Sequence, residues 1–124
     1  MARRILVVDD NPTNLKLVTY LVKANGYDVD TAADAEAALT AIARNRPDLI
    51  LMDLQLPGID GLELTRRLKT DPATADIRII AVTAYGGIEH RAKTKAAGFE
   101  QHLLKPLAPQ ALFDLLESTS PPSK

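Results

Sequence analysis

Five polar residues stand at the ends of short apolar runs and could together bind a metal ion and handle phosphate. They are Asp9, Asp10, Asp53, Thr83 and Lys105. Carboxylates crowded into one crevice repel each other unless a cation neutralises them. Because neither His nor Cys clusters with these acids, the ligand set would be all oxygen. Such a set favours Mg²⁺ or a similar hard ion, with Mn²⁺ as a substitute.

Once the cation compensates two of the acids, the third carboxylate can act as a nucleophile. Attack of an Asp oxygen on phosphorus gives an aspartyl phosphate, and such transfer depends mainly on positioning and charge stabilisation. Lys105 would place a positive charge against the phosphoryl oxygens, and Thr83 would donate a hydroxyl hydrogen bond. The backbone amides of Leu54 and Ala84, which follow the acid and the threonine, would complete the cradle.

Each of these residues also has a plainer interpretation when it is taken alone. Asp9-Asp10 could form a solvated turn before a helix, and Thr83 could be an ordinary strand residue. Lys105 could be a lysine in a surface loop. The functional interpretation is favoured because all of them are predicted at one rim of one sheet.

The elements that must position these residues follow from two kinds of periodicity. Short runs rich in Ile, Val and Leu predict strands buried on both faces at residues 5–8, 48–52, 77–82 and 99–104. A weaker alternating run predicts an edge strand at residues 28–31. Helical stretches lie between the strands. The first of them begins at the N-cap Asn11 and Pro12 and ends at Gly26.

The other four predicted helices differ in the apolar surface that they offer to a core. The second covers residues 34–45, the third begins at Asp60 with a capping box to Glu63, the fourth covers 88–97, and the fifth begins near Pro109. The fourth has only a narrow face of small residues and is expected to be the least tightly held. The residues expected to face the core are Leu15, Leu17, Val18, Leu21 and Val22 in the first helix, Ala38, Leu39 and Ile42 in the second, Leu64 and Leu68 in the third, Ile88, Ala92 and Ala96 in the fourth, and Leu112, Phe113 and Leu116 in the fifth.

Strand and helix alternate five times, which predicts an α/β fold with a five-stranded parallel sheet, helices on both faces and right-handed crossovers. The flavodoxin-like (βα)5 sandwich with strand order 2-1-3-4-5 is the leading candidate. In that order a crevice opens beyond the carboxyl ends of the first and third strands. One domain is expected over residues 1–118, followed by a flexible Ser/Pro tail at 119–124.

The composition excludes several classes of function. Lys+Arg 15 against Asp+Glu 16 gives a formal net charge of -1, without the electrostatic footprint of a nucleic-acid or membrane-surface binder. The absence of cysteine excludes disulfides, thiolate metal sites and cysteine nucleophiles. The sequence has neither a signal-peptide core nor an apolar run of about 18 residues. These features predict a cytoplasmic protein.

The motif set resembles the receiver domain of bacterial two-component response regulators, the CheY-like superfamily, and most closely the stand-alone DivK-like regulators. The resemblance covers residues 4–117 and is carried by Asp9-Asp10, by Asp53 within Leu51-Met52-Asp53-Leu54-Gln55-Leu56-Pro57-Gly58-Ile59-Asp60-Gly61, by Thr83-Ala84 and by Lys105-Pro106. One acid pair would be weak support, whereas four motifs in this order and spacing are highly specific.

The resemblance implies a signalling protein in which Asp53 is the phosphoacceptor. The donor would be a phosphohistidine on a sensor kinase or on a histidine phosphotransfer protein. Asp10 would be a direct Mg²⁺ ligand, Asp9 would act mainly through water, and Gln55 would supply its backbone carbonyl. Such a protein assists its own phosphorylation and dephosphorylation but is not an enzyme with a separate turnover substrate.

The resemblance also assigns the phosphate contacts and shows one departure from the family. Thr83 and Lys105 would contact the phosphoryl group, and the bond between Lys105 and Pro106 is expected to be cis. His102 occupies the position where the family usually carries Tyr or Phe, which calls a switch based on a turning aromatic ring into question. Tyr85, like Gln55, would flank the approach of water, and we expect this tyrosine to slow hydrolysis of the acyl phosphate.

The last expectations concern how the domain transmits the signal and which other functions the sequence allows. Phosphorylation would shift an equilibrium between two conformations, and a downstream protein would dock on the fourth helix, fifth strand and fifth helix. The alternatives are a receiver excised from a hybrid histidine kinase and a degenerate, non-phosphorylated interaction module. A haloacid-dehalogenase-type phosphatase is disfavoured because Gln55 stands where that family needs a second Asp. A nucleotide-binding flavodoxin-like protein is disfavoured because no Gly-rich loop follows the first strand.

Overall fold

Strands and helices alternate along the described part of the chain, within two residues of the predicted boundaries. In order they are β1 (Arg4–Val8), α1 (Pro12–Ala24), β2 (Asp28–Ala32), α2 (Ala35–Arg44), β3 (Leu49–Asp53), α3 (Gly61–Thr70), β4 (Arg78–Thr83), α4 (Ile88–Ala97), β5 (Gln101–Leu104) and α5 (Pro109–Thr119). This computed structural model describes residues 4–54, 61–83, 88–99, 101–104 and 109–119, without the side chains of 88–91, 101, 102, 104 and 117–119.

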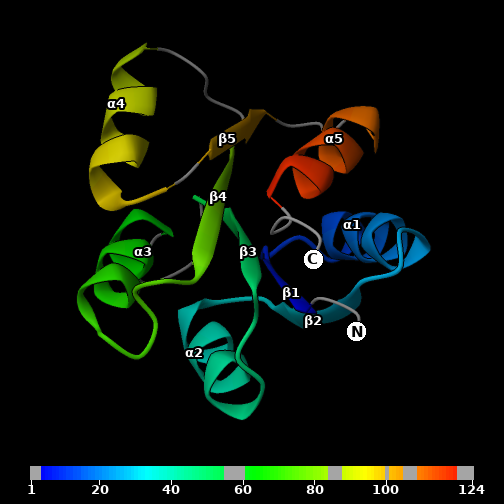
Figure 1. Cartoon of the computed structure of the whole chain (residues 1–124), viewed down its shortest axis with the longest axis horizontal. Coiled ribbons are helices and arrows are strands. Elements are labelled where there is room, and N and C mark those ends of the chain that lie inside the picture. Colours follow the sequence, from blue (N-terminus) through cyan, green and yellow to red (C-terminus); the bar gives the residue numbers. More distant parts are fainter. Residues whose placement is uncertain (1–3, 55–60, 84–87, 100, 105–108, 120–124) are drawn as a thin grey trace.

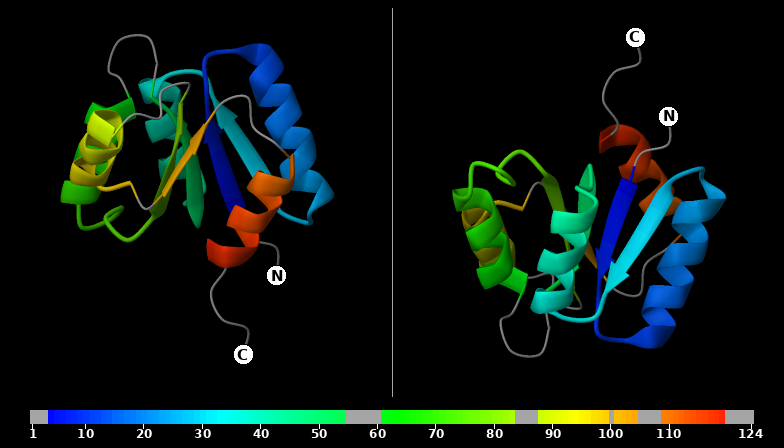
Figure 2. Two further views of the ribbon diagram at one scale, coloured as in Figure 1. Left: turned by 90° about the horizontal axis from the view of Figure 1, so that it is seen from above. Right: turned by 90° about the horizontal axis from the view of Figure 1, so that it is seen from below.

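The five strands form one parallel sheet in the order β2-β1-β3-β4-β5 (Figure 1). Helices α1 and α5 cover one face of this sheet, and α2, α3 and α4 cover the other (Figure 2). This confirms the predicted flavodoxin-like order, with β2 at an edge. The winding reverses between the neighbouring strands β1 and β3, which is the place where a site opens in such sheets.

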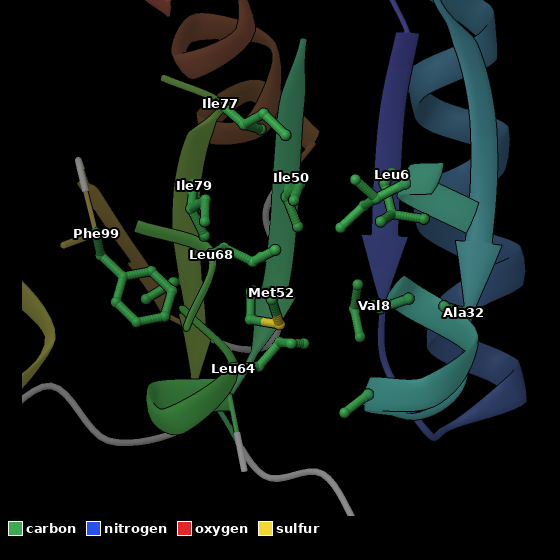
Figure 3. Packing of buried hydrophobic residues seen from close by; sticks show 14 of the residues in the cluster. Leu6, Val8, Ala32, Ile50, Met52, Leu64, Leu68, Ile77, Ile79 and Phe99 are labelled. Atoms are coloured by element: carbon green, nitrogen blue, oxygen red, sulfur yellow. The ribbon is translucent and has the colours of Figure 1, made fainter. Parts of the chain in front are cut away.

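The core consists of two apolar clusters, because successive side chains of a strand point to opposite faces of the sheet. Leu6, Ile50 and Ile79 belong to the cluster under α2, α3 and α4, whereas Ile5, Leu51 and Ile80 belong to the cluster under α1 and α5. Figure 3 shows Leu64 and Leu68 of α3 in the first cluster, beside the side chains of the central strands. The central strands are therefore packed against helices on both faces of the sheet. This packing holds their carboxyl ends in place, where a site could form.

The start and end of α1 follow the predicted signals. The Asn11 side-chain oxygen accepts hydrogen bonds from the backbone N–H groups of Thr13 (2.9 Å) and Asn14 (3.2 Å). After the last turn Gly26 adopts a φ of +89°, and its N–H donates to the Lys23 carbonyl over 2.9 Å. The capping box predicted at Asp60 lies outside the described residues.

Four predicted core positions are wrong. Leu17 of α1 is 47% exposed and Leu39 of α2 is 41% exposed. Both lie just beyond the buried arc of their helices, so the width of the stripe was overestimated. On α4 the predicted face is reversed, because Ala92 and Ala96 are exposed while Thr94 and Ala97 are buried. Alanine is compatible with either environment, so a helix without large apolar residues does not reveal its buried side. The side chain of Ile88 lies outside the described part.

Helix α5 buries Leu112 and Leu116 as predicted and holds Phe113 half-buried, with Leu115 as an additional buried residue. It extends to Thr119, one residue into the predicted tail, whose residues 120–124 lie outside the description. Among the helices described here, none combines the length and apolar character required to cross a bilayer.

Candidate functional site

Three carboxylates meet at the carboxyl ends of β1 and β3. Asp9 directly follows β1, Asp10 comes next, and Asp53 is the last residue of β3. Each offers a carboxylate oxygen, and these oxygens lie within 4.8 Å of one another. Asp9 and Asp53 are only 5% and 3% exposed, whereas Asp10 is open to solvent. The sheet order thus brings together acids that are more than 40 residues apart in the chain, as predicted.

Asp9 is held by the residue that caps α1 and by the end of β2. The Asp9 carboxylate accepts a hydrogen bond from the Asn11 backbone N–H over 2.9 Å, and the Asp9 N–H donates to the Ala32 carbonyl of β2 over 3.0 Å. Since Asn11 also caps α1, this helix begins directly beside the acids. The positive end of its dipole offsets part of their mutual repulsion.

The ladder between β3 and β4 holds Asp53. Asp53 pairs with Val82, and the N–H of Leu54 donates to the Val82 carbonyl over 3.3 Å. The Leu54 carbonyl in turn accepts from the N–H of Gly61, the first residue of α3, over 3.2 Å. The Leu54 amide, predicted to contact phosphate, therefore already has a backbone acceptor, and its phosphate contact stays a prediction.

Thr83 lies at the same rim of the sheet, where the strands have their carboxyl ends. It ends β4 one residue beyond Val82, the partner of Asp53, and is 1% exposed. Its partner in β5 is Leu104, the residue immediately before Lys105. The register therefore brings Thr83 to the rim where the acids lie and directs the end of β5 to the same rim.

Several predicted site residues are not tested. Gln55, Ala84, Tyr85, Lys105 and Pro106 lie outside the described residues. The backbone of His102 pairs with Ala81 in the sheet, but the side chain of this histidine is outside the description. The roles assigned to these residues stay predictions.

The chemistry of the donor set fits a hard divalent cation. Within the part of the chain that the structure describes, Asp9, Asp10 and Asp53 form the one close group of three metal-ligating side chains. All three donors are carboxylates, which suit Mg²⁺ or Mn²⁺, and a partly open site leaves room for the waters that Mg²⁺ usually retains. The acidic cluster and the buried hydroxyl of Thr83 lie at the carboxyl ends of the central strands of a doubly wound α/β protein. A bound cation and a hydroxyl donor are features that phosphoryl transfer uses.

The chain belongs to the response regulator receiver domain family, whose model matches residues 5–117. Response regulator PleD of Caulobacter vibrioides is 40% identical over 118 residues, covering 95% of this chain but only 26% of PleD. The polar-differentiation response regulator DivK of Brucella anthropi is 36% identical over 118 residues, covering 95% of this chain and 96% of DivK. The domain seen here thus accounts for nearly all of one relative and about a quarter of the other.

The solved structures agree with this assignment. The receiver domain of the sensor histidine kinase PA1611 from Pseudomonas aeruginosa is 33% identical, superposes with a TM-score of 0.86, and is matched over 95% of this chain and 97% of its own. Membership in the family makes the chain a phosphoacceptor signalling protein rather than an enzyme that turns over a separate substrate.

Gly61 adjoins the site, although in the sequence it stands out only as part of a motif. The structure places it against the backbone of Asp53. A glycine at the first position of a predicted helix, without a turn that needs it, is the signal that could have revealed this close approach.

Proposed function

We propose that Asp53 accepts a phosphoryl group from a phosphohistidine of a sensor kinase or of a histidine phosphotransfer protein, in a Mg²⁺-dependent reaction. The observation that carries the proposal is the carboxylate cluster. Asp53 is nearly buried, yet its oxygen lies within 4.8 Å of the carboxylate oxygens of Asp9 and Asp10. Family membership supports a histidine kinase as the partner.

Asp53 acts as the nucleophile. One of its carboxylate oxygens forms the new P–O bond while the P–N bond to the donor imidazole breaks, and the imidazole leaves with that electron pair and is protonated by solvent. The paired strand holds the aspartate backbone in place, so little conformational freedom is lost on the way to the transition state. Burial of Asp53 also restricts the access of water to the resulting acyl phosphate.

Asp10, Asp53 and the Gln55 carbonyl would hold the metal directly, and Asp9 would act through water. When bound, Mg²⁺ supplies the positive charge that allows an anionic phosphoryl donor to approach three carboxylates. The PA1611 receiver domain was solved with a magnesium ion coordinated in its active site cleft, which supports this part of the proposal.

Thr83 and Lys105 would bind the transferred group and start the response. Thr83 would donate its hydroxyl to a phosphoryl oxygen, and Lys105 would pair with the added charge. Thr83 is the last residue of β4, and Lys105 comes directly after β5 in the sequence. These contacts would therefore favour one of two conformations of the α4-β5-α5 face. A downstream protein would recognise that face.

The experiment is intact-mass spectrometry after incubation with acetyl phosphate. We expect the wild type to gain one phosphoryl group only with Mg²⁺ and the Asp53→Asn variant to gain none. Asp28→Asn is the matched control, because it removes an exposed carboxylate from edge strand β2 and should leave phosphorylation unchanged. Absence of any gain in a folded wild type would favour the degenerate interaction module instead.

A further inference from the structure

Gly61 lies unusually close to the phosphoacceptor strand. A Cβ atom at this position would overlap the carbonyl oxygen of Asp53, and it would come within 3.0 Å of the Leu54 Cα and 3.1 Å of the Met52 Cγ. Non-bonded carbon atoms are most stable at roughly 3.5 to 4.0 Å. Helix α3 can therefore begin where it does only because its first residue has no side chain.

The requirement for glycine at this position comes from space and not from backbone conformation. Gly26 and Gly98 are the described residues with positive φ, and Gly61 is not among them. An alanine would accept the backbone angles of Gly61 but not its surroundings. Gly26 shows the opposite combination, with a φ of +89° and no atom within 4 Å of an added Cβ.

The carbonyl oxygen that an added Cβ would overlap belongs to the peptide unit that joins Asp53 to Leu54. Helix α3 cannot easily move away from this peptide, because its Leu64 and Leu68 side chains are packed in the core, where they are 0% and 2% exposed. Asp53 and Leu54 are held on their other side by β4, through the 3.3 Å bond from the Leu54 N–H to Val82. A methyl group on Gly61 would therefore turn or push this peptide, and the Asp53 side chain would move with its backbone.

We infer that Gly61 is a positioning residue for Asp53. Because it lacks a side chain, α3 packs directly against the Asp53–Leu54 peptide and fixes the carboxylate of Asp53 relative to those of Asp9 and Asp10. The phosphorylation readout of this inference rests on the proposed function, whereas its metal-binding readout does not.

The test compares Gly61→Ala with Gly26→Ala in the full chain. Gly26 follows the C-terminal end of α1, a helix of 13 residues and so about 20 Å long, whose other end adjoins the acids. Its substitution strains the backbone away from the site and controls for a general loss of stability. For both variants we would measure the Mg²⁺ dissociation constant by calorimetry, the phosphorylation rate with acetyl phosphate at saturating Mg²⁺, and unfolding by urea.

We expect Gly61→Ala to weaken Mg²⁺ binding and to slow phosphorylation on the order of tenfold to 100-fold, the scale expected for a misplacement of about 1 Å. The folded fraction of Gly26→Ala should bind Mg²⁺ and be phosphorylated as wild type is. Equal effects in the two variants, or none in Gly61→Ala, would overturn the inference. If Gly61→Ala is unfolded, the measurements are repeated in sucrose, which favours the compact state. Failure to fold even there would show that Gly61 serves the fold and not the site.

The design separates this inference from the proposed function. If wild type binds Mg²⁺ but is not phosphorylated at Asp53, the proposed function fails, and the Mg²⁺ affinities of the two glycine variants still test Gly61. If wild type is phosphorylated and Gly61→Ala is phosphorylated at the same rate with the same Mg²⁺ affinity, the inference about Gly61 alone fails.

Discussion

Asp9, Asp10 and Asp53 share one site but are held differently. Asp9 is buried and bonded to the backbone of Ala32 and Asn11, and Asp53 is buried and pairs with Val82 of β4. Asp10 is exposed at the rim. Without a cation the three negative charges oppose folding, and with a cation they become its ligands. Because Asp10 is exposed, it can be replaced with little effect on packing.

At the residue scale we predict a reversal of stability for Asp10→Asn. In EDTA the variant should have a free energy of unfolding higher than wild type by about 0.5 kcal/mol, because one repelling charge is gone. With saturating Mg²⁺ the wild type should be the more stable protein, because binding to the folded state adds stability by mass action. Urea titrations under both conditions check this. If the variant gained as much stability from Mg²⁺ as wild type does, Asp10 would not be a metal ligand.

The two helices that flank the β4 side of the sheet are anchored unequally, although each has ten residues. Helix α3 buries Gly61, Leu64, Thr65 and Leu68. Of the α4 side chains that are described, those of residues 92–97, only Thr94 and Ala97 are buried. A helix with little buried apolar surface opens at a lower free energy than one anchored by leucines.

At the element scale we predict that the backbone amides of α4 exchange hydrogen faster than those of α3. Phosphorylation should change exchange in α4 and β5 more than in α2, since Thr83 connects the site to this side of the sheet. Hydrogen exchange followed by mass spectrometry, with and without acetyl phosphate and Mg²⁺, measures both effects. Equal protection of α3 and α4, or a response concentrated in α2, would contradict the prediction.

The whole molecule is stabilised by two apolar layers, one on each face of the sheet. In the layer under α2, α3 and α4, Leu64 is fully buried, whereas Leu39 on the neighbouring helix α2 is 41% exposed and lines a groove of about 470 Å³ between α2 and α3. The same residue type therefore occurs in two environments on one side of the sheet.

At the scale of the whole fold, we predict that Leu64→Ala lowers the free energy of unfolding by about 2 to 5 kcal/mol, because it leaves a cavity in the core. Leu39→Ala should change it by at most about 0.5 kcal/mol. Urea unfolding of the two variants, which lose the same atoms, provides the comparison. Similar losses in both would mean that Leu39 is part of the core after all.

Local patterns in the sequence determined most of the elements. The apolar runs at residues 5–8 and 77–82 are short and rich in β-branched side chains, as strands are. Asn11-Pro12 and Gly26 mark the ends of a helix. Such signals depend on the periodicity and caps of the chain itself, so they can be read without a fold. The position of Asp53 directly after a buried strand was equally readable. The family motifs then identified the site as that of a receiver domain.

The tertiary structure decided how these parts meet. The pairing of Asp53 with Val82 sets Thr83 beside the acids, and the rotation of α4 buries Thr94 instead of Ala92. The contact between Gly61 and the Asp53 backbone arises only when α3 packs on the sheet. Register, helix rotation and close approach depend on segments distant in the chain, so periodicity within one segment does not specify them.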